Sequence, residues 1–142
     1  MTSYVLDASV AAKWFIPDSE DLTAEASHLL ANYADDRLGF SVPDLFWPEV
    51  GNVVLKAARQ RRISVQDAQD AIATLKLQEF RTHASDLLIE PAMAIALSTN
   101  CTAYDGIYVA LAVMLDHTLI TADKRLVNAL QGRFNAKWLG AL

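Results

Sequence analysis

The chain has 142 residues, of which 53% are hydrophobic, and a formal net charge of −5 at pH 7. This length suits one domain with a sizeable core, so we expect a single domain over residues 1–142. The single cysteine, Cys101, excludes an internal disulfide, and the longest apolar run, 107–115, is too short to cross a bilayer. Because the N-terminus also lacks the pattern of a signal peptide, we expect a soluble cytoplasmic protein with no membrane partner.

Short apolar runs and helix-stop residues predict alternating strands and helices in the first half of the chain. In chain order these are a strand at 4–6, a helix at 8–15, a helix at about 18–35, a strand at 39–42 and a helix at about 43–61. Pro17 stops the first helix, and Asp18 or Ser19 can cap the second. Pro48 falls in the first turn of the third helix, which leaves its start open.

The second half continues this alternation. It contains a helix that begins at Ser64, a strand at 86–89, helices at 91–97 and 102–114, a strand at 118–121, a short helix at 124–130 and an edge strand at 137–139. Ser64 and Asp67 have the spacing of a capping box, with Asp in place of the usual Glu or Gln. Strands that alternate with helices predict an α/β fold with a mostly parallel sheet.

Four acidic residues lie where these elements should gather them beside a cleft. Asp7 and Asp123 directly follow apolar strands, Glu49 lies in a strongly apolar helix, and Asp105 begins another helix. Open α/β sheets bind ligands at the carboxyl ends of their strands. Two unit charges about 4 Å apart repel by about 4 kcal/mol at an effective dielectric of about 20, so gathered carboxylates require a cation. Oxygen ligands without a His or Cys cluster favour Mg²⁺ or Mn²⁺ and predict metal-assisted phosphodiester chemistry.

Each acid alone also has an ordinary structural explanation. Asp7 and Asp105 can cap the helices that they begin, and Glu49 can belong to a solvated stripe with Lys56 on the same helix face. Asp123 repeats the position of Asp7 on a second strand end. Two acids at strand ends and two in helices are harder to explain by capping than any one of them.

Three polar neighbours fit a metal site as supporting residues. Ser9 and Thr121 each place a hydroxyl two residues from an acid, where it can orient the carboxylate or hold a metal-bound water. Asn52 shares a helix face with Glu49.

Four segments, in this order, resemble a known family: 5–9, 48–53, 104–112 and 119–123. They are similar to the PIN-domain ribonucleases and, within these, to the VapC-type toxins of bacterial and archaeal toxin–antitoxin pairs. The resemblance extends nearly end to end and implies a three-layer α/β/α fold. It also implies an endoribonuclease that cleaves RNA with a metal-activated water, in which one or two Mg²⁺ or Mn²⁺ ions are held by Asp7, Glu49, Asp105 and Asp123. Ser9 and Thr121 occupy the family's supporting hydroxyl positions.

The same resemblance implies protein partners, and the chain departs from the family's pattern at two glycines. A cognate antitoxin is expected to lay its C-terminal segment in a groove and to send an Arg or Lys into the acidic site. The apolar helices around Trp14, Phe15 and Trp47 are candidates for that groove or for a homodimer face, with core packing as the alternative. Gly51 and Gly106 stand where similar sequences often have alanine, which is expected to weaken the helix starts.

The negative net charge is unusual for a protein that binds RNA phosphates. Setting the four acids aside leaves 13 acidic residues against 12 basic ones, so local basic patches decide the matter. Lys13, Lys56 and Arg59 are the candidates for guiding RNA, together with Arg61 and Arg62, for which complementing the helix dipole is the alternative.

Two other functions compete with the nuclease. A phosphatase of the haloacid dehalogenase type would use Asp7 as its nucleophile. That family is expected to carry an Asp-x-Asp motif at the first strand, and here Ser9 stands at the second acidic position of that motif. A non-catalytic binding module would use the acids as caps and as surface charges for a basic partner peptide. Metal titration separates the binding module from the metal-dependent nuclease, because an ion that binds the folded state raises its stability.

Overall fold

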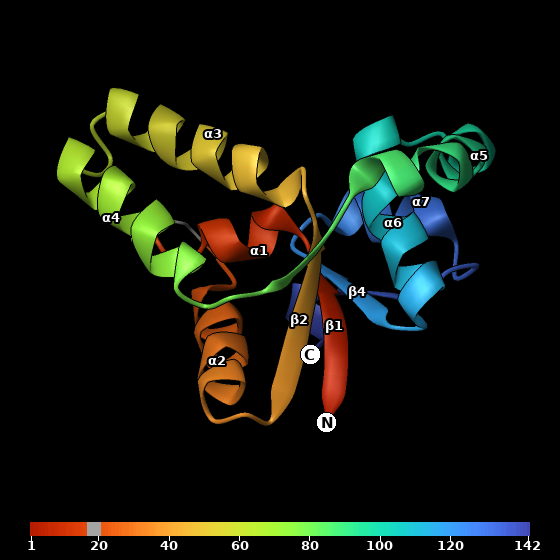
Figure 1. Ribbon diagram of the computed structural model, residues 1–142, viewed down its shortest axis with the longest axis horizontal. Coiled ribbons are helices and arrows are strands. Elements are labelled where there is room, and N and C mark those ends of the chain that lie inside the picture. The colour runs from red at the N-terminus through yellow and green to blue at the C-terminus, as the bar shows by residue number, and fades with distance from the viewer. Residues whose placement is uncertain (17–20) are drawn as a thin grey trace.

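A computed structural model describes residues 1–16 and 21–142 (Figure 1). Within them, five strands form one sheet in the order β3-β2-β1-β4-β5, and every neighbouring pair is parallel. The strands are β1 (Thr2–Leu6), β2 (Leu38–Pro43), β3 (Arg81–His83), β4 (Thr118–Thr121) and β5 (Ala136–Trp138). The predicted parallel sheet is confirmed, and it contains no antiparallel pair among the described strands.

Helices cover both faces of this sheet. They are α1 (Ala8–Ala12), α2 (Thr23–Ala34), α3 (Phe46–Arg59), α4 (Val65–Lys76), α5 (Ile89–Thr99), α6 (Ala103–Leu115) and α7 (Lys124–Leu130), with 3₁₀ turns η1 (Ser85–Leu87) and η2 (Leu139–Ala141). Figure 1 shows α1 and α2 on one side of the strands, α5 to α7 on the other, and α3 paired with α4 beyond the sheet. This is the three-layer α/β/α fold that the resemblance implies.

The strand order reverses between β1 and β4, which are neighbours in the sheet. From β1 the chain moves toward β2 and β3, whereas from β4 it moves the other way, to β5. Such a switch point leaves a crevice at the carboxyl ends of the two strands. Asp7 follows β1 and Asp123 follows β4, and the backbone amide of Asp7 donates to the carbonyl of Ile120 at 3.0 Å. The topology therefore places two of the four acids at the switch point.

Helix α6 is apolar almost all round because it is a buried helix. Its residues Gly106 to Ala112 are all buried, and it packs against α5, β1, β2 and β4. A methyl group added at Gly106 would overlap the backbone carbonyl of Ala92 in α5. Gly106 therefore allows α5 and α6 to pack closely. The sequence predicted only a weaker helix start at this glycine.

Several predicted elements need correction. Residues 86–89 form no strand, since they are divided between η1 and the start of α5, while the third strand lies at Arg81–His83. An apolar run this short fits a strand or a buried helix segment equally well. The first helix ends at Ala12, earlier than predicted. Pro17, Asp18 and Ser19, the predicted stop and caps, lie outside the described residues. No described helix is long and apolar enough to cross a membrane.

Candidate active site

Asp7 occupies the N-cap position of α1 but makes no capping hydrogen bond to that helix. Its Oδ2 instead accepts hydrogen bonds from the hydroxyls of Ser9, at 2.8 Å, and Thr121, at 2.7 Å. Both hydroxyls are oriented in turn, because Ser9 Oγ accepts from the amide of Ala122 and Thr121 Oγ1 accepts from the amide of Asp123, each at 3.0 Å. Two hydroxyls, one from the first turn of α1 and one from the end of β4, thus fix one carboxylate oxygen.

Glu49 lies in the first turn of α3 and is partly buried. Its Oε1 accepts a hydrogen bond of 2.8 Å from the hydroxyl of Tyr108, which α6 carries. Lys56 is exposed, and in the described part of the chain it forms no ion pair with Glu49. The solvated stripe is therefore not what holds Glu49 in place.

Asp105 and Asp123 both act as helix caps. Asp105 forms a capping box with Thr102, whose amide donates to Asp105 Oδ2 at 3.3 Å and whose hydroxyl accepts from the Asp105 amide at 3.1 Å. Asp123 Oδ1 accepts from the amides of Arg125, at 3.0 Å, and Leu126, at 3.4 Å, and lies 3.7 Å from Arg125 Nε. The capping explanation holds for Asp105, yet each cap uses one carboxylate oxygen and leaves the other for a further ligand.

Three of the four acids influence one another electrostatically. Burial raises the pKa of Asp7 above its ordinary value, the hydroxyls of Thr121 and Ser9 oppose that rise, and the charge of Asp105 adds to it. Burial also raises the pKa of Glu49, against the hydrogen bond from Tyr108, and the charges of Asp7 and Asp105 raise it further. Among the described residues, no Lys or Arg pairs with these three acids. The cluster is an uncompensated negative site.

Asp123 lies on the Asp105 side of this cluster. Both residues line a cavity of about 440 Å³ together with Thr102 and Arg125. Within residues 1–16 and 21–142, no three acidic, His or Cys side chains stand close enough to hold a metal ion as they lie. The fold brings the four acids to one region, and their joint action on a metal stays a prediction.

The raised pKa of Asp7 predicts that the free energy of unfolding of the metal-free protein depends on pH. Between the ordinary value of 3.8 and the higher folded-state value, the folded protein keeps a proton that the unfolded chain has lost. The free energy of unfolding therefore falls as pH rises through this window. In EDTA, Asp7→Asn should remove the part of this fall that Asp7 causes, so the stability of the variant relative to wild type should increase as pH rises above about 4. Urea denaturation measures the difference, and a difference that does not change with pH would contradict the assignment.

Some of the other predicted site residues contact the acids, and the rest do not. Ser9 and Thr121 contact the acids, whereas Asn52 is exposed and has no hydrogen bond to them among the described residues. Lys56 and Arg59 are exposed on α3, and Lys13 Nζ donates to the carbonyl of Asp21 at 3.0 Å. Tyr108 contacts Glu49 but was not predicted as a site residue. In the sequence it stands out only as a phenol among the aliphatic side chains that follow Asp105.

The aromatic residues proposed for a groove pack on the core. Trp14, Phe15 and Trp47 are partly buried against it, and Trp14 Nε1 donates to the carbonyl of Ala26 at 2.8 Å. Core packing is thus confirmed for all three. Trp14 and Phe15 also line an open cavity of about 350 Å³ against α4, beside Asp67 and Asp70.

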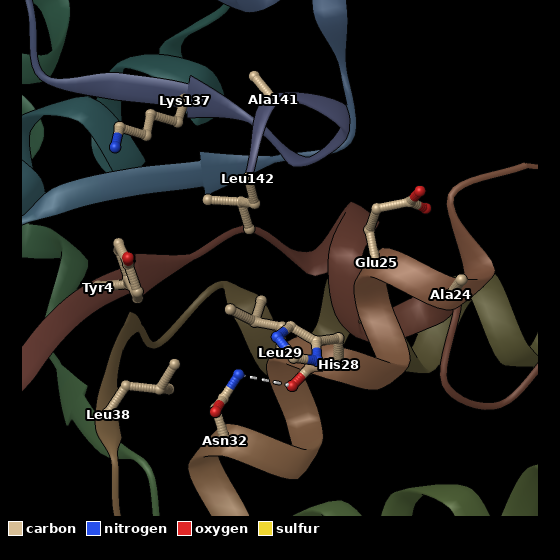
Figure 2. A pocket seen from close by; sticks show the side chains of 10 residues that line it. All are labelled: Tyr4, Ala24, Glu25, His28, Leu29, Asn32, Leu38, Lys137, Ala141 and Leu142. Carbon is tan, nitrogen blue, oxygen red and sulfur yellow. Dashed lines mark hydrogen bonds between the residues drawn. The ribbon is translucent and has the colours of Figure 1, made fainter.

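A larger cavity of about 680 Å³ lies away from the acids, between α2 and the C-terminal residues (Figure 2). Leu29 and Leu38 contribute apolar surface, and Glu25, His28 and Lys137 contribute polar groups. In Figure 2, the side-chain amide of Asn32 donates to the backbone carbonyl of His28, at 3.1 Å. None of the four acids lines this cavity, so it offers no alternative place for their chemistry.

Comparison with known proteins identifies the family. The sequence model of the PIN domain matches residues 4–129. The chain belongs to the PIN-domain family. Within this family, a VapC ribonuclease from Mycobacterium bovis is 31% identical over 129 residues, which are 91% of this chain and 92% of that protein. The similarity to PIN-domain and VapC proteins noted in the sequence is thereby confirmed.

Two solved structures share the PIN-domain fold over nearly the whole chain. A crystal structure from Pyrobaculum aerophilum has a TM-score of 0.71 at 23% identity, over 99% of this chain and 85% of that chain. A toxin–antitoxin complex from Klebsiella pneumoniae has a TM-score of 0.61 at 18% identity, over 94% of this chain and 95% of that chain. At these identities the likeness shows the fold alone.

Proposed function

We propose that this PIN-domain protein is a metal-dependent endoribonuclease and the toxin of a VapBC-type toxin–antitoxin pair. The observation that carries the proposal is the uncompensated acidic cluster at the switch point, with Asp7 held by two hydroxyls and flanked by Glu49 and Asp105. The VapC relative from Mycobacterium bovis, which matches this chain over nearly its whole length, is named a ribonuclease. A site of carboxylates alone suits a hard divalent cation, and such a cation in turn binds the phosphate oxygens of RNA.

The donor set fits Mg²⁺ or Mn²⁺. Asp7, Glu49, Asp105 and Asp123 offer only oxygen atoms, and the mutual repulsion of the first three gives a cation a reason to bind. When bound, such an ion supplies Lewis acidity and an activated water for attack on phosphorus. Ser9 and Thr121 both hold Asp7 through Oδ2, so neither hydroxyl uses its second oxygen. The two helix caps hold Asp105 and Asp123 in place.

The proposed partners follow from the charged and aromatic surfaces. Exposed Lys56 and Arg59 continue along α3 beyond Glu49, where they can bind RNA phosphates. The cavity of Trp14 and Phe15 has an acidic rim, which suits a basic segment of an antitoxin. The related Klebsiella structure is a toxin–antitoxin complex. Formation of a homodimer stays a prediction.

The direct test is metal-dependent RNA cleavage by the partner-free protein. We expect it to cut a mixed pool of structured and single-stranded RNA with Mn²⁺ or Mg²⁺ and to stop in EDTA. The same ion should raise the melting temperature, since a ligand at 100 times its dissociation constant stabilises a folded protein by about 2.7 kcal/mol. Absence of both cleavage and stabilisation would reject the nuclease and favour the binding module.

A further inference from the structure

We propose that Tyr108 is a positioning residue that holds the Glu49 carboxylate within the acidic cluster, an inference that rests on the proposed function. Tyr108 lies in the middle of α6 and is only 2% exposed. Its hydroxyl donates to Glu49 Oε1 at 2.8 Å, across the space between α6 and α3. This is the one hydrogen bond that the Glu49 side chain makes among the described residues.

The hydroxyl of Tyr108 also lies near the segment that carries Asp7. The backbone of Ala8, the first residue of α1, and the charge of Asp7 both act on this hydroxyl. Tyr108 therefore lies between Glu49 on α3, which it contacts directly, and the turn between β1 and α1 that carries Asp7.

The environment keeps this hydroxyl a donor. Burial raises the pKa of Tyr108 far above its ordinary value of 10.0, and the charges of Asp7 and Glu49 raise it further. The 2.8 Å hydrogen bond therefore runs from the phenol O–H to the Glu49 carboxylate, which when ionised can only accept.

Without this hydroxyl, Glu49 has reason to leave the cluster. Its carboxylate is partly exposed, carries a long flexible side chain and is repelled by Asp7 and Asp105. Loss of the hydrogen bond should let the side chain turn toward water, where its charge is better solvated. A metal would then have to recruit Glu49 at an entropic cost. Residues that orient a metal ligand typically contribute 10- to 100-fold to metal affinity.

The test compares Tyr108→Phe with a matched tyrosine variant, using Mn²⁺ alone and no RNA. Tyr33 is the control because its hydroxyl also donates a hydrogen bond, to the carbonyl of Gln78 at 2.6 Å, in a different part of the protein. Calorimetric titration should show Mn²⁺ binding weakened by about 10- to 100-fold in Tyr108→Phe and unchanged in Tyr33→Phe. Denaturation curves recorded first establish that both variants are folded.

A double-mutant cycle separates positioning from a general structural role. In the Glu49→Ala background, Tyr108→Phe should weaken Mn²⁺ binding no further, because the group that it positions is gone. An equal loss in both backgrounds, or an unchanged affinity in Tyr108→Phe, would overturn the positioning role while the proposed function stands. If wild type itself binds no Mn²⁺, the proposed function fails and the role of Tyr108 fails with it.

Discussion

Replacing Asp7 by Asn should lower RNA cleavage by roughly 10²- to 10⁴-fold and leave the protein folded. The expected factor follows because a catalytic metal contributes several kcal/mol to the transition state and each 1.36 kcal/mol is about tenfold in rate. Asn keeps the size of Asp and an oxygen that can accept from Ser9 and Thr121, so the hydroxyl contacts need not be lost. What Asn removes is the negative charge. Single-turnover cleavage of one defined RNA at saturating Mn²⁺ measures the effect.

The matched control is Asp86→Asn, which removes one carboxylate charge from an exposed position in η1. Both variants change the net charge equally, so a general effect of charge on RNA binding would appear in both. We expect cleavage to be unchanged in Asp86→Asn. Full cleavage by Asp7→Asn, with wild-type affinity for Mn²⁺, would show that Asp7 does not serve the metal.

The position of Asp7 could be predicted from local sequence, whereas the pairing around it could not. Val5 and Leu6 are apolar and β-favouring, which places the next residue at a strand end. Ser9 was expected beside Asp7, and the structure confirms that contact. Thr121 was expected to support Asp123, but its hydroxyl donates to Asp7 and accepts from the Asp123 amide. That contact depends on β1 lying next to β4, and strand order is not a local property.

The misplaced third strand has a related cause. Arg81 and Thr82 are exposed and His83 is only partly buried, so β3 lacks the apolar run that identifies a strand in sequence. It forms because β2 offers a free parallel edge, with which Ser41, Val42 and Pro43 are in register. Tyr108 was overlooked for a similar reason, since its partner Glu49 lies 59 residues away.

The second large effect concerns Gly106, which follows Asp105 in α6. Alanine there would gain helix propensity, yet its methyl group would overlap the carbonyl of Ala92 and force α5 and α6 apart. Overpacking of this kind typically costs about 1–3 kcal/mol, more than the roughly 0.5–1 kcal/mol that alanine gains over glycine within a helix. Gly106→Ala should therefore lower the free energy of unfolding, measured by urea denaturation. Because Asp105 precedes it, RNA cleavage should fall as well.

Gly51→Ala in α3 is the matched control, since a methyl group there would meet no atom within 4 Å. This variant should instead raise the free energy of unfolding by roughly 0.5–1 kcal/mol, the ordinary advantage of alanine within a helix. The two glycines look equivalent in the sequence, and only the approach of α5 distinguishes them. Equal stabilisation by both substitutions would show that α5 can move aside, and that the close contact at Gly106 does not fix the start of the helix that carries Asp105.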